Sequence, residues 1–237
     1  MRLFYDFHIH TCLSPCGDSD MTPNNVVNMA LIKGLDAIAI TDHNACGNAE
    51  AAMQVGREAG LLVIPGMEIE SCEEVHIVAL FETLDACKQM EAIVQAALPP
   101  IQNKPEIFGE QWILNAEDDC IGEETRMLVT ACGLSVYDIV EHIHALGGVA
   151  IAAHVDKSAY SVISNLGFLP EDLSFDAAEL SKNAKSKGWE DTDERLCGLR
   201  ALHSSDAHYL GDLNEPEHAL ESEGRQIATV LKQIKKK

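Results

Sequence analysis

Basic residues are scarce in this sequence. Lys and Arg number 17 against 38 Asp and Glu, which gives a formal net charge of −21, and aromatic residues make up only 5% of the chain. Proteins that bind a long phosphate backbone rely on clustered cationic side chains, often with aromatic side chains between them. The scarcity of both argues against long nucleic acid as a partner, while a mononucleotide or dinucleotide stays open.

Long apolar runs are also absent. No window approaches the roughly 20 apolar residues that span a bilayer, and the stretch MRLFYDF lacks the apolar segment of a secretion signal. The eight cysteines include no CxxC pair, and the chain is large enough to form a core without disulfides. We therefore expect a cytoplasmic protein that has no membrane partner. The sequence does not indicate an oligomeric state.

Short apolar runs do recur, and helical stretches separate most of them. Strands are predicted at 3–8, 37–41, 61–67, 75–81, 149–153, 175–179 and 199–204. Helices are predicted at 24–33, 49–59 and 135–146. Strand followed by helix, repeated along 237 residues, predicts an α/β barrel that forms a single domain over 1–237.

Two segments depart from this alternation. Only IESCEE separates Glu68 from Val75, and a parallel crossover needs a dozen residues or more. We therefore expect an antiparallel hairpin there. Residues 98–133, which include PPIQNKP and NAEDDCIGEE, interrupt the pattern and are interpreted as an insertion or lid.

Two histidine pairs with the same spacing receive different interpretations. His8 and His10 stand at the end of the first predicted strand, where residues two apart share a face and can bind one ion together. His142 and His144 lie in EHIHALGG, a helical pattern in which residues two apart diverge. We interpret this second pair as surface or packing histidines.

Further histidines and carboxylates occupy the ends of other predicted strands. They are Asp42 and His43 in TDH, Glu68 in PGMEIE, His76 in VHIVAL, His154 in IAAH, and Asp206 and His208 in SDAH. Strand ends meet at one mouth of a barrel. Any one of these histidines alone would be interpreted as a hydrogen-bonded core residue. Together with the carboxylates they predict a centre for more than one Zn, Mn or Fe ion, because a carboxylate can bridge two ions.

These motifs, with HIH and DSDMTP, resemble those of the PHP (polymerase and histidinol phosphatase) superfamily over most of the chain. The resemblance implies a distorted TIM-like barrel of seven β/α units and a phosphoesterase centre of two to three divalent ions. By position, the first ion would take His8, His10, Glu68 and Asp206, the second Glu68, His76 and His154, and the third Asp18, His43 and His208. Asp18 is chosen for its spacing from TP, and Cys16 and Asp20 stay open as alternatives.

The resemblance also implies roles. Glu68, Asp206 and His208 would be the catalytic residues, and Asp42 would orient a ligating imidazole. Lys157 and Lys182 are candidates for phosphate contact, with an exposed loop lysine as the alternative for each.

The implied reaction is hydrolysis of a phosphoester, on a small molecule or a short nucleotide, by a metal-activated hydroxide. One alternative is a nuclease-type phosphodiesterase that acts on nucleic acid. Another is a PHP scaffold or regulatory module without activity, which need not keep its ligands.

Overall fold

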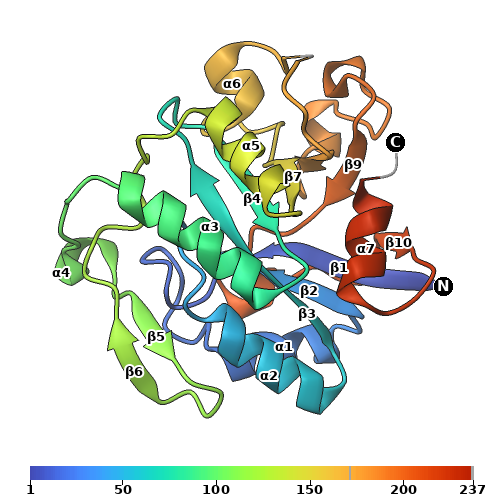
Figure 1. Ribbon diagram of the computed structural model, residues 1–237. Helices are drawn as coiled ribbons and strands as arrows, with labels where there is room; N and C mark the ends of the chain where they lie inside the picture. The colour runs from blue at the N-terminus through green and yellow to red at the C-terminus, as the bar shows by residue number, and fades with distance from the viewer. Residues whose placement is uncertain (171, 236–237) are drawn as a thin grey trace.

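The computed structural model describes residues 1–170 and 172–235. Most of its strands form one curled sheet with the spatial order β10-β1-β2-β3-β4-β7-β8-β9 (Figure 1). These strands are β1 (Arg2–Ile9), β2 (Ala37–Ile40), β3 (Leu62–Glu70), β4 (His76–Leu80), β7 (Val149–Ala152), β8 (Ala177–Leu180), β9 (Arg200–His203) and β10 (Ala219–Glu221). All seven predicted strands are present, and the predicted α/β barrel-like fold is confirmed. The short β10 was not predicted.

The strand directions follow the expected hairpin. Strands β1, β2 and β3 are parallel, as are β7, β8 and β9, whereas β4 runs antiparallel to both β3 and β7. The register pairs Glu70 with His76 and Glu68 with Val78. Because β4 runs in the opposite direction, it begins at the end of the barrel where its neighbours finish. His76 therefore lies at the same mouth as Glu68, and the predicted hairpin is confirmed.

The chain that follows β9 returns to β1. Ile9 and Ala207 form a parallel bridge, and the His10 amide donates a 3.0 Å hydrogen bond to the Ala207 carbonyl. The curled sheet is thus closed at its mouth by the segment that carries Asp206 and His208. This closure brings the two ends of the sequence pattern together.

Seven α-helices accompany the sheet in the part of the chain that the structure describes. They are α1 (Pro23–Ile32), α2 (Ala49–Ala59), α3 (Leu84–Ala97), α4 (Pro105–Phe108), α5 (Val136–Ala145), α6 (Val162–Leu166) and α7 (Ile227–Ile234). Short 3-10 helices cover Lys185–Lys187, Glu194–Leu196 and Leu210–Asp212. Helix α1 begins as its sequence indicates, because Thr22 accepts a hydrogen bond from the Asn25 amide and Pro23 occupies the first turn. None of these helices is long and apolar enough to cross a membrane.

Apolar side chains pack on both faces of the sheet. The interior of the barrel holds Tyr5, Phe7, Ile64, Val78 and Ile151, among others. A larger cluster lies between the outer face of the sheet and the helices. The interior cluster fills the barrel below its mouth, so the polar residues on the same face are confined to the strand ends.

Within residues 98–133, helix α4 and the two-stranded sheet of β5 (Trp112–Leu114) and β6 (Cys120–Glu123) lie apart from the curled sheet in Figure 1, while Leu98, Leu128 and Cys132 belong to the main core. The Trp112 amide donates to the Cys12 carbonyl at 3.1 Å, and the Thr22 hydroxyl donates to Asp118 at 2.5 Å. The segment therefore packs on the loop between β1 and α1. Its role as a lid stays a prediction.

Candidate metal centre

A bulge in β1 aims the first two histidines into the barrel. Between Asp6 and Ile9 the pairing with β2 gains one extra residue, because Asp6 pairs with Ile38 and Ile9 with Ile40. A bulge of this kind reverses which side chains face a given side of the sheet. Tyr5 and Phe7 face the barrel interior below the bulge, and His8 and His10 face the mouth above it.

The first group at the mouth is His8, His10, Glu68 and Asp206, whose ligand atoms all lie within 4.8 Å of one another. The Nε2 atoms of the two histidines are 3.2 Å apart. Asp206 Oδ1 lies 3.4 Å from His8 Nε2 and 3.2 Å from His10 Nε2. Both imidazoles and Glu68 are almost completely buried. This is the set predicted for the first ion.

The other ring nitrogen of each histidine is already engaged. His8 Nδ1 lies 3.0 and 3.1 Å from the two carboxylate oxygens of Glu179. His10 Nδ1 lies 2.9 Å from the Ser14 hydroxyl, which donates to Asp42 Oδ1 at 2.7 Å. Because Glu179 accepts only, and Ser14 uses its proton for Asp42, each Nδ1 carries a hydrogen and each Nε2 is the atom that a proton or a metal ion can occupy.

The two Nε2 atoms face each other at 3.2 Å, so either a shared proton or a metal ion must lie between or beside them. Two imidazole nitrogens bound to one Zn at 2.0–2.1 Å are about 3.1–3.4 Å apart. The donor set of two imidazoles and two carboxylates therefore suits a divalent transition ion in chemistry and in spacing.

Glu68 extends the centre on both sides. Its Oε1 lies 2.8 Å from His76 Nδ1 and 3.1 Å from His154 Nε2, and its Oε2 lies 3.1 Å from His43 Nδ1. Oε1 is also 3.3 Å from His8 Nε2. One buried carboxylate thus contacts histidines from four segments, which is the arrangement of a bridging ligand.

Charge within this cluster shifts the protonation of its members. Burial lowers the pKa of His8, but neighbouring carboxylates led by Glu179 outweigh it and hold that pKa well above the usual 6.5. Burial and adjacent imidazoles hold the pKa of His10 well below it. Burial raises the pKa of Glu68, but the imidazoles, led by His76, hold it well below its usual range. The centre carries a net demand for positive charge that protons or metal ions can meet.

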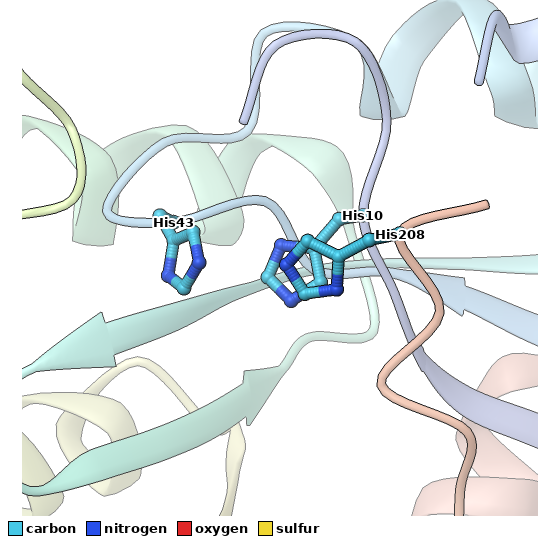
Figure 2. Close-up of side chains that lie close together, drawn as sticks. All are labelled: His10, His43 and His208. Carbon is cyan, nitrogen blue, oxygen red and sulfur yellow. The ribbon is translucent and has the colours of Figure 1, made fainter. Parts of the chain in front are cut away.

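A third group forms on the far side of His10. The nitrogens of His10, His43 and His208 lie within 4.8 Å of one another. Figure 2 shows the three rings close together, with those of His10 and His208 overlapping in this view. The ring centroids of His10 and His208 are 4.2 Å apart, and the two rings are stacked. His43 Nδ1 is buried and has no hydrogen-bond partner of acceptable geometry. The predicted pair His43 and His208 is therefore brought together.

Asp18 does not join any of the three groups. Its Oδ1 accepts a 2.9 Å hydrogen bond from the Asp20 amide, within the turn that these residues form. The thiol of Cys16 instead lies 3.1 Å from His208 Nε2. Desolvation raises the pKa of Cys16, but hydrogen bonds with His208 and His43 outweigh it and bring the value to about 6.

Two predicted metal ligands adopt strained backbone conformations. His154 has φ of 29° and Asp206 has φ of 53°, in the region that residues other than glycine rarely occupy. Such a conformation costs about 1–3 kcal/mol and persists where the surrounding structure requires it. Strain at these two positions coincides with the convergence of their side chains on Glu68 and His8.

The two candidate phosphate contacts have different positions. Lys157 forms an ion pair with Asp206 and lines a cavity of about 190 Å³ together with His76, His154 and Tyr160. Lys182 donates to the Asp212 carbonyl and lines a larger cavity, of about 710 Å³, whose lining includes none of the predicted metal ligands. Of the two lysines, only Lys157 therefore lies at the centre.

Sequence reasoning missed Glu179 and Ser14. Glu179 is a charged residue in the apolar run FDAAEL, and its position within a predicted strand was the signal that the sequence offered. The structure buries it almost completely. Asp42 reaches His10 only through the Ser14 hydroxyl, and it also accepts from the Thr11 amide at 2.6 Å, so its orienting role stays a prediction. His142 and His144 were predicted to be surface or packing histidines. His144 bonds to Asp176 at 2.9 Å, and neither residue belongs to a group of possible metal ligands in the described part of the chain.

Comparisons with known proteins give the following likenesses. The PHP domain family matches residues 6–143, more than half of the chain. A 5'-3' exoribonuclease from Haemophilus influenzae is 23% identical over 189 residues, which are 63% of this chain and 68% of that protein. The crystal structure of the lesion-specific endonuclease Q from Pyrococcus furiosus has a TM-score of 0.71 at 18% identity, and covers 99% of this chain.

A proposed metal-dependent phosphoesterase from Bifidobacterium adolescentis has a TM-score of 0.60 at 20% identity, over 97% of this chain and 95% of that one. This chain spans only 56% of the endonuclease. At 18% and 20% identity, the two structural likenesses establish the fold alone.

Proposed function

The chain belongs to the PHP domain family, and on that premise we propose that it is a metal-dependent hydrolase of phosphoesters. The observation that carries the proposal is the pair of nitrogens, His8 Nε2 and His10 Nε2, that face each other at 3.2 Å beside the buried Glu68 and Asp206. Protons can bridge these groups, but two imidazole nitrogens and two carboxylates that converge at these distances also form a set of metal ligands. Its chemistry is that of a site for divalent ions.

We propose the following ligands. His8, His10, Glu68 and Asp206 would hold a first ion. Glu68, His76 and His154 would hold a second, with Glu68 as the bridge, and His43 lies close enough to Glu68 and His76 to contribute there as well. His43 and His208 would belong to a third. Zn, Mn and Fe all suit mixed imidazole and carboxylate ligation.

Divalent ions at such a centre supply a low pKa for bound water and neutralise charge on phosphate oxygens. The chain's own residues prepare the site. Glu179 and Ser14 fix the two imidazoles so that their Nε2 atoms face the ions. Lys157, at the rim of the cavity, supplies a positive charge that can bind a phosphate oxygen when it exchanges its partner Asp206 for substrate.

The substrate class follows from size and charge. The cavity over the centre is about 190 Å³ and is lined by Lys157, Tyr160 and histidines. It accepts a phosphoryl group and adjoining atoms but not a duplex. Because the protein carries a net charge of −21, only the metal centre and the lysine beside it would attract a phosphate group. We propose a phosphorylated small molecule or a short nucleotide as substrate, and the free thiols of all eight cysteines favour a reducing compartment such as the cytoplasm.

A nuclease-type diesterase is the second candidate. The 23% identity with an exoribonuclease favours it, because that protein is named for stepwise hydrolysis of RNA. A short oligonucleotide could place its terminal phosphodiester at the centre without a long basic groove. The two candidates share the metal centre and differ in the ester that it cleaves.

A panel of substrates tests the proposal. Metal-free protein would be loaded separately with Zn, Mn or Fe and assayed on phosphate monoesters, nucleotides and short single-stranded oligonucleotides. We expect hydrolysis of at least one class, lost on chelation and restored by metal. Release of mononucleotides from oligonucleotides would select the nuclease candidate. No hydrolysis of any phosphoester by fully loaded protein would refute both.

A further inference from the structure

The loop that follows β1 is folded tightly against the mouth of the barrel. The Gly17 amide donates to the Ser14 carbonyl at 2.8 Å, and the Asp18 amide donates to the His208 carbonyl at 2.9 Å. A Cβ on Gly17 would lie 2.4 Å from the Thr11 carbonyl oxygen, so only glycine permits this turn. These contacts fix the intervening residue, Cys16, beside His208.

His208 directs Nε2 at the Cys16 thiol. Its Nδ1 lies 2.9 Å from the Asp206 carbonyl and donates to it, so Nε2 is the nitrogen that shares a proton with Cys16 or binds a metal ion. Nε2 lies 3.1 Å from Cys16 Sγ. In a tetrahedral Zn site a sulfur at 2.3 Å and a nitrogen at 2.0–2.1 Å are about 3.6 Å apart. A displacement of about half an ångström converts the present pair into two ligands of one ion.

A second observation points to an ion at the same place. His43 is 7% exposed, and its Nδ1 lies 3.1 Å from Glu68 Oε2 without forming a hydrogen bond. One of its ring nitrogens lies within 4.8 Å of one nitrogen of His208 and one of His10, and the Cys16 thiol contacts the rings of both His43 and His208. A buried imidazole with an unsatisfied nitrogen is costly unless it binds something.

The two carboxylates that the sequence left open are directed elsewhere. Asp18 Oδ1 accepts from the Asp20 amide within their turn. Asp20 is exposed, and its carbonyl accepts from the Asn25 side chain, which holds this part of the loop toward α1. Of the three loop candidates, which all lie in the described part of the chain, only Cys16 brings its side chain against the His208 ring, whereas Asp18 reaches His208 through its backbone amide.

We propose that the Cys16 thiolate, with His43 and His208, binds the third ion of the centre, in place of the carboxylate expected from the loop. On binding, a sulfur–metal bond and a nitrogen–metal bond form, and the proton that Cys16 and His208 share is released to solvent. A thiolate with two imidazoles favours Zn over Mn at this position, and the fourth position stays open. The proposal rests on the metal centre of the proposed hydrolase, and metal spectroscopy tests it without reference to turnover.

Cobalt substitution tests the assignment. Metal-free protein loaded with excess Co²⁺ should show a near-ultraviolet thiolate-to-cobalt charge-transfer band with the intensity of one thiolate. Cys16→Ser should abolish the band and lower the metal content by one ion per chain. Asp18→Asn should keep both. Cys120→Ser, which removes an exposed thiol in β6, is the matched control and should also keep both.

Alkylation of the unmutated protein provides a second measurement that does not depend on the folding of a variant. Zn²⁺ should slow modification of Cys16 by about tenfold or more, while Cys120 reacts at the same rate with and without metal. The proposal is overturned if wild-type protein shows no thiolate band, if the band survives Cys16→Ser, or if bound Zn²⁺ leaves the reactivity of Cys16 unchanged. An inactive protein that shows the band would refute the proposed function alone.

Discussion

Replacement of Glu179 by Gln is the perturbation that best isolates how the structure prepares its metal ligands. Glu179 is 2% exposed, and both its oxygens lie within 3.1 Å of His8 Nδ1. Its Oε1 also accepts from the His154 amide at 3.2 Å. A Gln side chain keeps one acceptor oxygen and places an NH₂ group where the second was. Either His8 Nδ1–H or the His154 amide must then face the new NH₂ group, which is itself a donor.

The magnitude follows from what Glu179 supports. Loss of a residue that orients a metal-binding histidine lowers metal affinity about 10–100-fold, which is about 1.4–2.8 kcal/mol. His8 loses the group that fixes its ring, and His154 is reached only through its backbone. We therefore expect the upper part of this range for the first ion and the lower part for the second.

The assay is competition for Zn²⁺ between metal-free protein and a chromophoric chelator at neutral pH. Glu91→Gln is the matched control, because this carboxylate accepts a 2.8 Å hydrogen bond from the Cys46 amide and is not one of the predicted ligands. The control should bind Zn²⁺ as wild type does. If folded Glu179→Gln protein binds both ions within about twofold of wild type, the argument that Glu179 sets the orientation of His8 is wrong.

Three further outcomes follow from the same contacts. Glu68→Gln should lower occupancy of two ions together in elemental analysis, because a neutral amide bridges poorly, and loss of a single ion would argue against bridging. Zn²⁺ affinity should fall on acidification. Burial lowers the pKa of His8, but its carboxylate neighbours outweigh burial and raise it, so below that raised pKa a proton occupies the nitrogen that a metal needs; a pH-independent affinity across the neutral range would contradict this. Gly17→Ala should lower the melting temperature and cost about 1–3 kcal/mol of folding stability, because the new Cβ would lie 2.4 Å from a carbonyl oxygen. Gly211→Ala is the control, because open space surrounds that glycine, and its melting temperature should not change. Equal melting temperatures for the two variants would show that the loop adapts.

The barrel could be predicted because its strands are short apolar runs with turn signals between them. The interval of six residues after Glu68 was enough to reverse β4, since a chain that short cannot cross over to form a parallel strand. The convergence of strand ends then followed from the architecture. Helix α3, in contrast, was not predicted, although Thr83 caps it and the capping residue was visible in the sequence.

Parts of the candidate site depend on features that the simple alternation of side chains along a strand does not predict. The bulge between Asp6 and Ile9 rotates His8 and His10 to the mouth, and no local pattern marks it. The sequence favoured Asp18 as the loop ligand because of its spacing from the TP pair. The fold instead places the Cys16 side chain beside His208, because Gly17 permits a tight turn that spacing alone does not reveal. Lys182 follows a strand end as Lys157 does, yet it points into a different cavity.

Hydrolysis by matched wild-type and Asp206→Ala proteins, with metal content measured on the same samples, tests the central claim most directly. Asp206 lies 3.4 and 3.2 Å from the two histidine nitrogens of the first group and pairs with Lys157 at the cavity rim. The account predicts that wild-type protein hydrolyses a phosphomonoester or a short oligonucleotide only when loaded with metal, and that Asp206→Ala binds less metal and shows no turnover. Activity that persists after complete chelation, or that survives in Asp206→Ala, would contradict it.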